Sequence, residues 1–284
     1  MSRVIVIAGP TASGKTALAI ETAQKLGGEI VSADSMQIYR RMDIGTAKAT
    51  EEEQALAVHH MIDIVDPQEN YSVSRYVEDA AACCEDILSR GGIPIICGGT
   101  GLYIDSLLSG RDFGESPEGG SLREELSALY DEAGGEEMLR ALAEFDPDRA
   151  ARLAPNDKKR IVRAFEVYRL TGETITAHDE RTAKLPKRYE AEYHILGMDC
   201  REALYERINA RVDKMFSLGL VEEVEALLGD IPPEATSMQG IGYKETAAYI
   251  RGELSLDEAT DLIKQSSRRY AKRQITWFKK YITA

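Results

Sequence analysis

Short runs of apolar residues, each bounded by turn-forming residues, recur along this chain of 284 residues. Helix-length amphipathic stretches lie between most of these runs. Short apolar runs that alternate with helices predict an α/β fold in which a parallel sheet is covered by helices on both faces. The five predicted strands are residues 4–8, 29–33, 61–65, 93–97 and 193–198.

The pattern changes after Gly110, where residues 110–120 are rich in glycine and polar groups and are typical of a connection. From Ser121 to about Thr171 the sequence is helical throughout, and strand character returns at Tyr193. We therefore predict a discontinuous α/β core of residues 1–119 and 190–284. A helical insertion domain of residues 120–189 is predicted to interrupt this core.

Three sequence signals predict where helices begin. Ser121 with Glu124, and Ser255 with Glu258, match the capping box, in which a serine and a glutamate satisfy each other's backbone N–H groups. Asp146 is followed by a proline, as expected for an N-cap residue before the first helical position.

The chain shows no feature that would place it in a membrane or outside the cell. No apolar run approaches the roughly 20 residues that span a bilayer, and the N-terminus enters the first strand without a signal-peptide cleavage site. Cys83, Cys84, Cys97 and Cys200 have neither CxxC nor zinc-ligand spacing, which is typical of reduced thiols in a reducing compartment. We expect a cytoplasmic protein without a membrane partner, and a monomer is the simplest expectation.

The net charge of −13 is unevenly distributed. Residues 111–150 carry −8 and residues 151–192 carry +3, and the last twenty residues hold six basic groups and no acid. A polyanion is attracted by the local electrostatic potential of a surface. The negative net charge of the whole chain therefore does not exclude RNA as a partner. Arg269, Arg273 and Lys280 recur at a spacing that predicts one basic face of the last helix, a candidate for phosphate contacts.

Residues 9–16 read GPTASGKT and match the phosphate-binding pattern G-x-x-x-x-G-K-[ST], between a predicted strand and a predicted helix. Such a loop wraps a diphosphate or triphosphate with its backbone N–H groups, and the helix N-terminus adds partial positive charge. We expect Lys15 to bond phosphoryl oxygens and the Thr16 hydroxyl to ligate Mg²⁺. The predicted diphosphate-binding residues are Gly9, Pro10, Thr11, Ala12, Ser13, Gly14, Lys15 and Thr16.

Two further loops follow predicted strands and therefore reach the same sheet edge as the phosphate loop. Asp34 stands where the second predicted strand gives way to polar sequence. Its position alone leaves open whether it is functional, caps a helix or holds the magnesium shell. Gln37 has an amide that both donates and accepts, which suits contact with a base edge. In the loop GGTG, Thr100 directs a hydroxyl to this edge and is also a candidate N-cap of the following helix, and the two roles are compatible.

Seven ordered blocks that cover most of the chain resemble the tRNA dimethylallyltransferase (tRNA isopentenyltransferase) family in its bacterial form. Several of these blocks are unusual, so the resemblance is far more specific than the phosphate loop alone. The blocks are GPTASGKT, SADSMQIYRRMDIGTAK, HHMIDIVDP, GGTGLY, NDKKRIVRAFEVYRLTGET, MQGIGYKE and RRYAKRQITWF.

The resemblance implies a P-loop, nucleoside-kinase-like core whose loop holds the diphosphate of dimethylallyl diphosphate rather than ATP. It implies Mg²⁺-dependent transfer of the dimethylallyl group to N6 of the adenine just 3′ of the anticodon, in tRNAs that read codons beginning with U. The product would be N6-dimethylallyladenosine. The helical insertion would clasp the anticodon stem-loop.

By matching motif, the resemblance implies that Asp34 bonds the adenine amino group and acts as general base. It also implies that Thr100 is a polar contact near the reacting centre and that Arg211 contacts the diphosphate. The residues implied to contact tRNA are Asp34, Ser35, Met36, Gln37, Arg123, Lys159, Arg160, Ile161, Val162 and Arg163.

Three alternatives remain at this level. The phosphate loop alone would favour a nucleoside or small-molecule kinase, which would turn over ATP. A prenyltransferase acting on free adenine nucleotides would share the loop and Asp34, but would not need a large insertion or a basic terminal helix. A GTPase-like RNA-binding module is disfavoured because the guanine-reading N/T-K-x-D motif is missing from the sequence.

Overall fold

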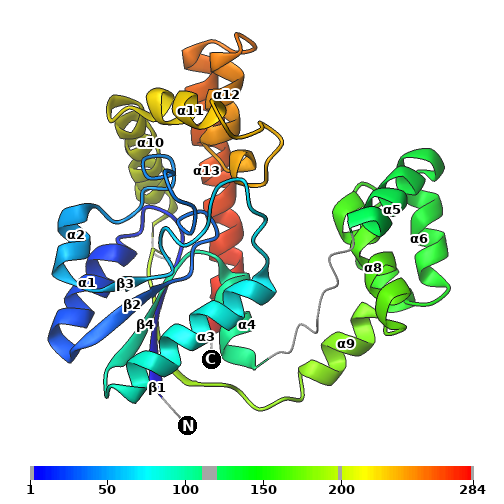
Figure 1. Ribbon diagram of the computed structural model, residues 1–284, viewed down its shortest axis with the longest axis horizontal. Coiled ribbons are helices and arrows are strands. Elements are labelled where there is room, and N and C mark those ends of the chain that lie inside the picture. The colour runs from blue at the N-terminus through cyan, green and yellow to red at the C-terminus, as the bar shows by residue number, and fades with distance from the viewer. Residues whose placement is uncertain (1–2, 111–119, 198–199, 283–284) are drawn as a thin grey trace. The chain divides into compact units, whose positions relative to one another are not determined.

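The computed structural model of the protein describes residues 3–110, 120–197 and 200–282. The chain divides into two compact units (Figure 1). The core unit comprises Met1–Leu108 and Arg188–Ala284, and the insertion unit comprises Ser109–Lys187. The predicted insertion of residues 120–189 covers nearly the same stretch.

The core unit contains a five-stranded sheet of order β3-β2-β4-β1-β5, in which all neighbouring strands are parallel. This is the α/β fold class that the hydrophobic pattern predicts. Parallel strands end at one edge of the sheet, so the loops after β1, β2 and β4 are brought together there. The strands are β1 (Arg3–Ala8), β2 (Gly28–Ser32), β3 (His59–His60), β4 (Ile93–Gly98) and β5 (Glu190–Ile195).

The predicted strand at residues 61–65 is wrong, because β3 consists only of the two histidines before it. Met61 and Asp63 have φ values of 62° and 56°, in the left-handed region, which interrupts an extended strand. Val65 forms only an isolated bridge with Tyr39. Part of the last predicted strand, at residue 198, lies outside the described residues.

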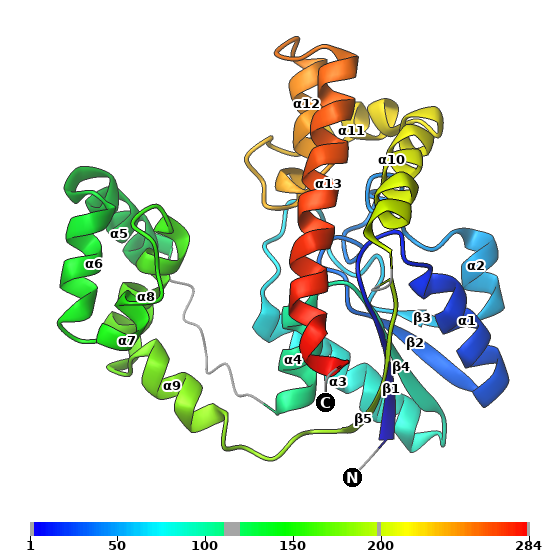
Figure 2. The ribbon, with the colours of Figure 1, turned by 180° about the vertical axis from the view of Figure 1, so that it is seen from behind.

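Helices cover both faces of the sheet (Figure 2). Helices α1 and α3 both pack on β2 and β4, and α1 buries Ala19, Ile20 and Ala23 against the sheet. The capping box predicted at Ser255 is formed at the start of α13. The α-helices of the core unit are α1 (Lys15–Leu26), α2 (Glu51–Leu56), α3 (Val73–Ser89), α4 (Gly101–Ser109), α10 (Arg201–Ser217), α11 (Leu220–Leu228), α12 (Tyr243–Ile250) and α13 (Leu256–Phe278).

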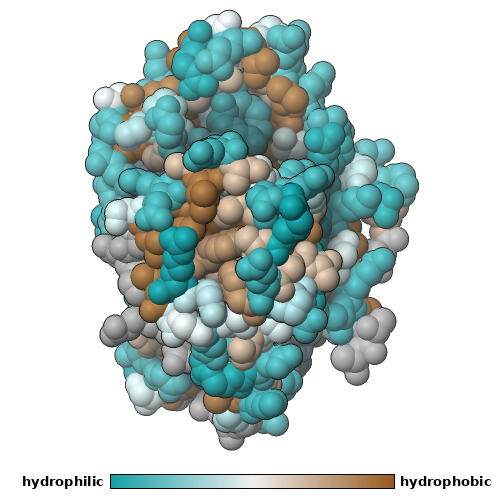
Figure 3. All heavy atoms as spheres, turned by 90° about the vertical axis from the view of Figure 1, so that its right-hand side faces the viewer, coloured by the Kyte–Doolittle hydropathy of each residue, from teal (hydrophilic) through white to brown (hydrophobic). Residues whose placement is uncertain are grey.

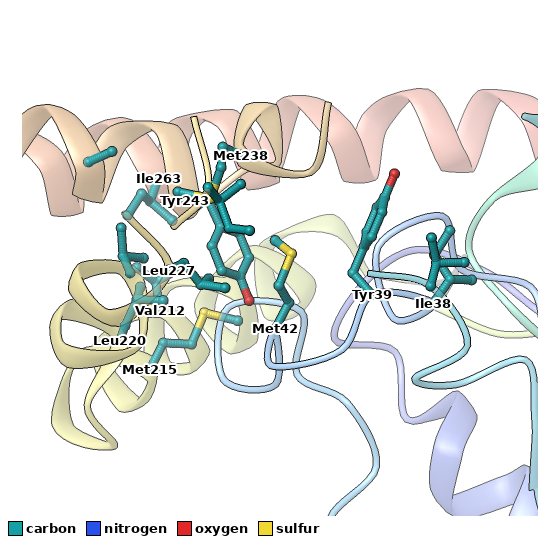
Figure 4. Packing of buried hydrophobic residues seen from close by; sticks show 14 residues of the cluster. Ile38, Tyr39, Met42, Val212, Met215, Leu220, Leu227, Met238, Tyr243 and Ile263 are labelled. Carbon is teal, nitrogen blue, oxygen red and sulfur yellow. The ribbon is translucent and has the colours of Figure 1, made fainter. Parts of the chain in front are cut away.

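In a second apolar cluster, the four helices α10, α11, α12 and α13 pack against the loop that follows β2 (Figure 4). The buried ring of Tyr243 lies in this cluster among the methionines Met42, Met215 and Met238. Two short 3₁₀ helices, Ser237–Gln239 and Lys279–Tyr281, complete this part of the chain. The cluster anchors the post-β2 loop to the C-terminal helices, so residues far apart in sequence meet at the sheet edge.

The insertion unit is a small helical bundle with its own apolar core, which includes Leu126, Leu142 and Phe165. Asp146 caps α7 as predicted, whereas Ser121 lies inside a helix that already begins at Gly120. The helices are α5 (Gly120–Ala133), α6 (Gly135–Ala143), α7 (Pro147–Ala150), α8 (Lys158–Thr171) and α9 (Ile175–Thr182).

The surface of the protein carries both polar and apolar side chains. Figure 3, in which the right-hand side of Figure 1 faces the viewer, shows an apolar patch bordered by hydrophilic side chains. The exposed large apolar residues of the insertion unit include Leu129, Tyr168 and Leu170. Among the described residues, no helix is both long and apolar enough to cross a bilayer.

Candidate active site

The phosphate loop has the backbone geometry that its glycines permit. Gly9 has φ 147°, and a Cβ there would lie 2.5 Å from the carbonyl oxygen of Leu196, so a larger residue does not fit. Gly14 is the N-cap of α1 and has φ 87°, a left-handed conformation that strains other residues. Arg207 supports the loop from α10 by donating to the carbonyl oxygen of Ala12 at 3.0 Å.

Lys15, the first residue of α1, lies inside this loop. Its Nζ donates to the carbonyl oxygen of Pro10 at 2.6 Å. Burial lowers the pKa of Lys15 to about 8; Cys97 and Asp34 oppose this effect, and the nearby Arg211 adds to it. A buried amine beside a second cation is the arrangement expected where an anion is to be bound.

A cavity of about 340 Å³ opens at this edge of the sheet, and all of its lining belongs to the core unit. Part of the lining is polar and comes from Thr11, Lys15, Thr16, Asp34 and Arg211. Another part is apolar and comes from Met36, Ile208, Val212, Met215, Ile241 and Ile263. The cavity therefore combines anion-binding groups with a surface suited to a hydrocarbon group.

Arg211 projects from α10 toward the phosphate loop. Its two terminal nitrogens donate to Thr11 Oγ1 at 3.1 Å and to the Thr46 carbonyl oxygen at 3.3 Å. Its Nε is buried and has no hydrogen-bond partner within the described ranges. Burial lowers the pKa of Arg211, and the charge of Asp34 opposes this effect. A buried donor without a partner is costly, and an anionic ligand in the cavity would remove that cost.

Asp34 lies two residues after the end of β2, at the sheet edge and in the cavity wall. Its Oδ1 accepts from the backbone N–H groups of Met36 at 2.9 Å and Gln37 at 3.4 Å, so it does cap the turn that follows. Thr100 does not line the cavity; its Oγ1 accepts from the N–H of Ser35 at 3.1 Å. Thr100 therefore holds the loop that carries Asp34.

Gln37 lines the cavity, but protein groups already engage its amide. The oxygen accepts from Ser32 at 3.2 Å, and the nitrogen faces the carbonyl oxygens of Thr46 and Ala47 at 3.4 and 3.3 Å. Gln37 can bond the edge of a base only after these hydrogen bonds break. Ser35 and Met36 line the same cavity.

Tyr270 and Gln274 of α13 also line the cavity, and neither was singled out from the sequence although both lie in the block RRYAKRQITWF. Gln274 accepts from the N–H of Thr11 and donates to the carbonyl oxygen of Gly99, both at 2.9 Å. Burial raises the pKa of Tyr270 to about 12, the charge of Asp34 adds to this effect, and bonds to Thr100 and Gln274 oppose it. No separate signal in the sequence marked Tyr270 and Gln274, because basic residues dominate this block.

The structure corrects part of the predicted RNA surface in the insertion unit. Ile161 and Val162 are 0% and 5% exposed in its apolar core, so their side chains cannot reach a nucleic acid. Arg123 and Arg163 bond the completely buried carboxylate of Glu166, at 2.9 and 2.7 Å, and so have a structural role in α5 and α8. Lys159 and Arg160 are exposed. Arg160 pairs with Asp157.

The basic face predicted for the last helix is wrong for Lys280, because α13 ends at Phe278. Lys280 Nζ pairs with Asp105 at 2.5 Å and lies over the ring of Trp277. Arg269 and Arg273 are exposed on α13, and Arg273 also lines the cavity. These two arginines therefore remain the candidates for phosphate contacts on α13.

The parallel sheet, the phosphate loop after β1 and the helical insertion define the class of the protein. It is an α/β protein of the P-loop, nucleoside-kinase-like type. A family model described as IPP transferase matches residues 37–281, and one described as Isopentenyl transferase matches residues 2–62. The chain belongs to the IPP transferase family.

Curated relatives and solved structures agree with this assignment. The tRNA dimethylallyltransferase of Acetivibrio thermocellus is 50% identical over 99% of this chain and 90% of its own, and that of Caldanaerobacter subterraneus is 48% identical over 98% and 89%. The tRNA isopentenylpyrophosphate transferase structure from Staphylococcus epidermidis has a TM-score of 0.71 at 43% identity, covering 98% and 90% of the two chains. A eukaryotic dimethylallyltransferase acting on tRNA has a TM-score of 0.83 at 32% identity, covering 98% and 70%.

Proposed function

We propose that this protein transfers a dimethylallyl group from dimethylallyl diphosphate to tRNA. The acceptor is N6 of the adenine 3′-adjacent to the anticodon, in tRNAs that read codons beginning with U, and the product is N6-dimethylallyladenosine. The observation that carries the proposal is that Lys15, Arg211, Asp34 and an apolar wall share one cavity, and that Arg211 Nε has no partner within the part of the chain that the structure describes. The relatives named for this reaction over nearly the whole chain support the choice of substrates.

The chemistry requires an activated electrophile, because the lone pair of the adenine amine is delocalised into its ring. The bond between the allylic carbon and the diphosphate oxygen breaks as N6 bonds the carbon, and pyrophosphate leaves. Lys15, Arg211 and the N–H groups of the phosphate loop are placed to stabilise the departing charge. Preorganised donors of this kind are each worth about 3–4 kcal/mol of barrier.

Asp34 is proposed to accept the proton that N6 loses as it acquires positive charge, an effect of roughly 10²–10⁴ in rate. Its Oδ1 is held by backbone N–H groups, which orients the carboxylate toward the cavity. The apolar wall of the cavity would exclude water, which would otherwise capture the allylic cation.

We propose Mg²⁺ as the cofactor. Thr16, the second residue of α1, lines the cavity, and Mg²⁺ at such loops is held by few protein oxygens together with phosphate oxygens and water. No group of three or more metal-ligating side chains occurs among the described residues, so the donor set suits a phosphate-bound ion rather than a protein cage. When bound, Mg²⁺ would supply charge neutralisation at the diphosphate.

The anticodon stem-loop is proposed to contact residues 34–37, the exposed Lys159 and Arg160, and the two arginines Arg269 and Arg273. Bases in single-stranded loops leave their stack at low cost, so an adenine beside the anticodon can enter the cavity. Because such tRNAs are found in the cytoplasm, we propose a cytoplasmic protein. We also propose a monomer, which light scattering of the purified protein would check.

The decisive experiment incubates an anticodon stem-loop with the protein, Mg²⁺ and dimethylallyl diphosphate, followed by mass spectrometry. We expect one five-carbon unit on the adenine, and little transfer when adenosine monophosphate replaces the stem-loop. Transfer of phosphate from ATP to an acceptor would instead establish a kinase. Equal transfer to free adenosine monophosphate would establish a prenyltransferase acting on free nucleotides.

A further inference from the structure

Glu223 on α11 lies outside the cavity lining but binds the loop that forms one of its walls. Its Oε2 accepts from the backbone N–H groups of Asp43 at 2.9 Å and Ile44 at 2.8 Å. Its Oε1 accepts from the N–H of Gly45 at 3.1 Å and from the hydroxyl of Tyr243 at 2.7 Å. One carboxylate therefore collects four donors, three of them consecutive along the backbone.

The turn held in this way supplies groups to the anion-binding part of the cavity. Directly after Gly45, the carbonyl oxygen of Thr46 accepts from Arg211 at 3.3 Å. The next residue, Ala47, has φ 45°, a left-handed conformation that a non-glycine residue keeps only when its surroundings hold it. Gly45, Thr46 and Ala47 all line the cavity.

A second set of bonds holds the same loop independently of Glu223. The buried Nζ of Lys48 donates to the carbonyl oxygen of Tyr39 at 2.9 Å and to the carboxylates of Asp43 and Asp63, each at 2.5 Å. The loop is therefore tied to the fold at Lys48 as well. Breaking the bonds to Glu223 should mainly shift the position of the turn.

We propose that Glu223 is a positioning residue for the diphosphate end of the cavity. By holding the N–H groups of residues 43–45, it fixes the Thr46 carbonyl oxygen that orients the guanidinium of Arg211. The inference rests on the proposed function only in that the anion at Arg211 is a diphosphate. It assigns to α11 a role in the reaction although no residue of this helix lines the cavity.

The direction in which Glu223→Gln changes pyrophosphate affinity distinguishes a positioning role from a direct charge effect. Replacing Glu223 by glutamine removes a negative charge near an anion site, which by itself would strengthen pyrophosphate binding. It also places an amide NH₂ against N–H donors, so the turn loses acceptors and shifts. Positioning therefore predicts weaker binding, the opposite of the charge effect.

The test is calorimetric titration of the full chain with inorganic pyrophosphate and Mg²⁺. We expect Glu223→Gln to weaken binding about tenfold, while the affinity for an anticodon stem-loop stays within twofold of wild type. The matched control is Glu225→Gln on the same helix; Glu225 is exposed and makes no ion pair within the described ranges, so this change should leave pyrophosphate binding unaltered.

A double-mutant cycle with Arg211→Lys distinguishes positioning from general structural damage. Arg211→Lys keeps the charge, so pyrophosphate binding stays measurable, and in this background Glu223→Gln should change the affinity less than twofold. An undiminished effect in that background, or wild-type affinity of Glu223→Gln alone, overturns the inference. If wild type itself fails to bind pyrophosphate, the proposed function fails first, and this inference fails with it.

Should Glu223→Gln prove unfolded by circular dichroism, Tyr243→Phe provides the second test. It removes, without changing charge, the hydroxyl that holds Oε1 against the N–H of Gly45, so the carboxylate loses part of its hold on the turn. We expect a two- to fivefold loss of pyrophosphate affinity in the folded variant. Wild-type affinity in that variant would overturn the inference.

Discussion

Gln274 Oε1 accepts a hydrogen bond of 2.9 Å from the backbone N–H of Thr11, although the two residues are 263 positions apart. The amide nitrogen of Gln274 donates at the same time to the carbonyl oxygen of Gly99. One buried side chain of α13 thus joins the phosphate loop to the loop after β4, and it sets the spacing of two walls of the cavity.

Replacing Gln274 by leucine should destabilise the core unit and weaken pyrophosphate binding. The buried carbonyl oxygen of Gly99 and the half-buried N–H of Thr11 lose their partners, and an unsatisfied buried group costs about 1–3 kcal/mol. Urea unfolding followed by the fluorescence of Trp277 measures the loss. Gln265→Leu, at an exposed position of the same helix, is the control and should cost less than about 0.5 kcal/mol. A loss for Gln274→Leu no greater than that of the control would contradict this role.

Pyrophosphate binding should weaken as the pH rises through about 8. Burial has lowered the pKa of Lys15 to this value, so the free protein carries the ammonium below it and the neutral amine above it. An anion binds the charged form, and affinity should fall by at most about tenfold per pH unit above 8. Lys15→Arg stays charged, so its pyrophosphate affinity should lack this fall and change with pH only as the ligand itself titrates. If affinity depends on pH in the same way in both proteins, Lys15 is not the group responsible.

Asp34→Asn should abolish most turnover while sparing RNA binding. The asparagine oxygen can still accept from the N–H of Met36, so the turn is kept, but the side chain no longer takes up a proton. We expect single-turnover transfer to slow by roughly 10²–10⁴, with the stem-loop dissociation constant within twofold of wild type. Transfer within threefold of the wild-type rate would show that another group removes the proton.

Glu166→Gln should loosen the insertion unit. Burial alone would raise the pKa of Glu166, but bonds from Arg123 and Arg163 outweigh it and leave the pKa below its ordinary value. The ion pairs therefore stabilise fully above the unfolded pKa of about 4.3, and that stability is lost as pH falls through the folded pKa. Because Arg123 is 59% exposed and can rehydrate, we expect a loss of about 1–3 kcal/mol.

Hydrogen exchange of the α5 and α8 amides measures this change within the insertion unit. Glu125→Gln is the matched control, because its bond to Arg169 joins two exposed side chains and is worth less than about 1 kcal/mol. Equal protection in the two variants would show that the buried carboxylate does not hold these helices together.

Neutralising Arg269 and Arg273 together should flatten the salt dependence of RNA binding. The slope of log K against log salt should become shallower by about 0.7–0.9 for each phosphate that the protein no longer neutralises. Titration of a stem-loop at several salt concentrations measures the slope. Lys280→Gln should change it less, because Lys280 is paired with Asp105. An unaltered slope in the double variant would remove α13 from the RNA surface.

The local patterns of the sequence were enough for the phosphate loop and for the strands beside it. The conformations of Gly9, Gly14 and Lys15 depend on the turn and the helix end of their own segment, and a short motif encodes both. The position of Asp34 at the sheet edge could be predicted for the same reason, since it follows a strand whose direction fixes that edge. The two-residue β3 was missed because left-handed residues at Met61 and Asp63 interrupt an apolar run that otherwise looks extended.

The sequence by itself determined a parallel α/β core with a phosphate loop and a helical insertion, since these depend on periodicity and short motifs. Only the tertiary structure decided which polar side chains form hydrogen bonds or ion pairs with other parts of the protein. The pairing of Arg123 with Glu166, the reach of Gln274 to Thr11 and the hold of Glu223 on residues 43–45 each join segments distant in sequence. No local pattern encodes such bonds, because they exist only once the buried apolar surfaces of separate helices have packed.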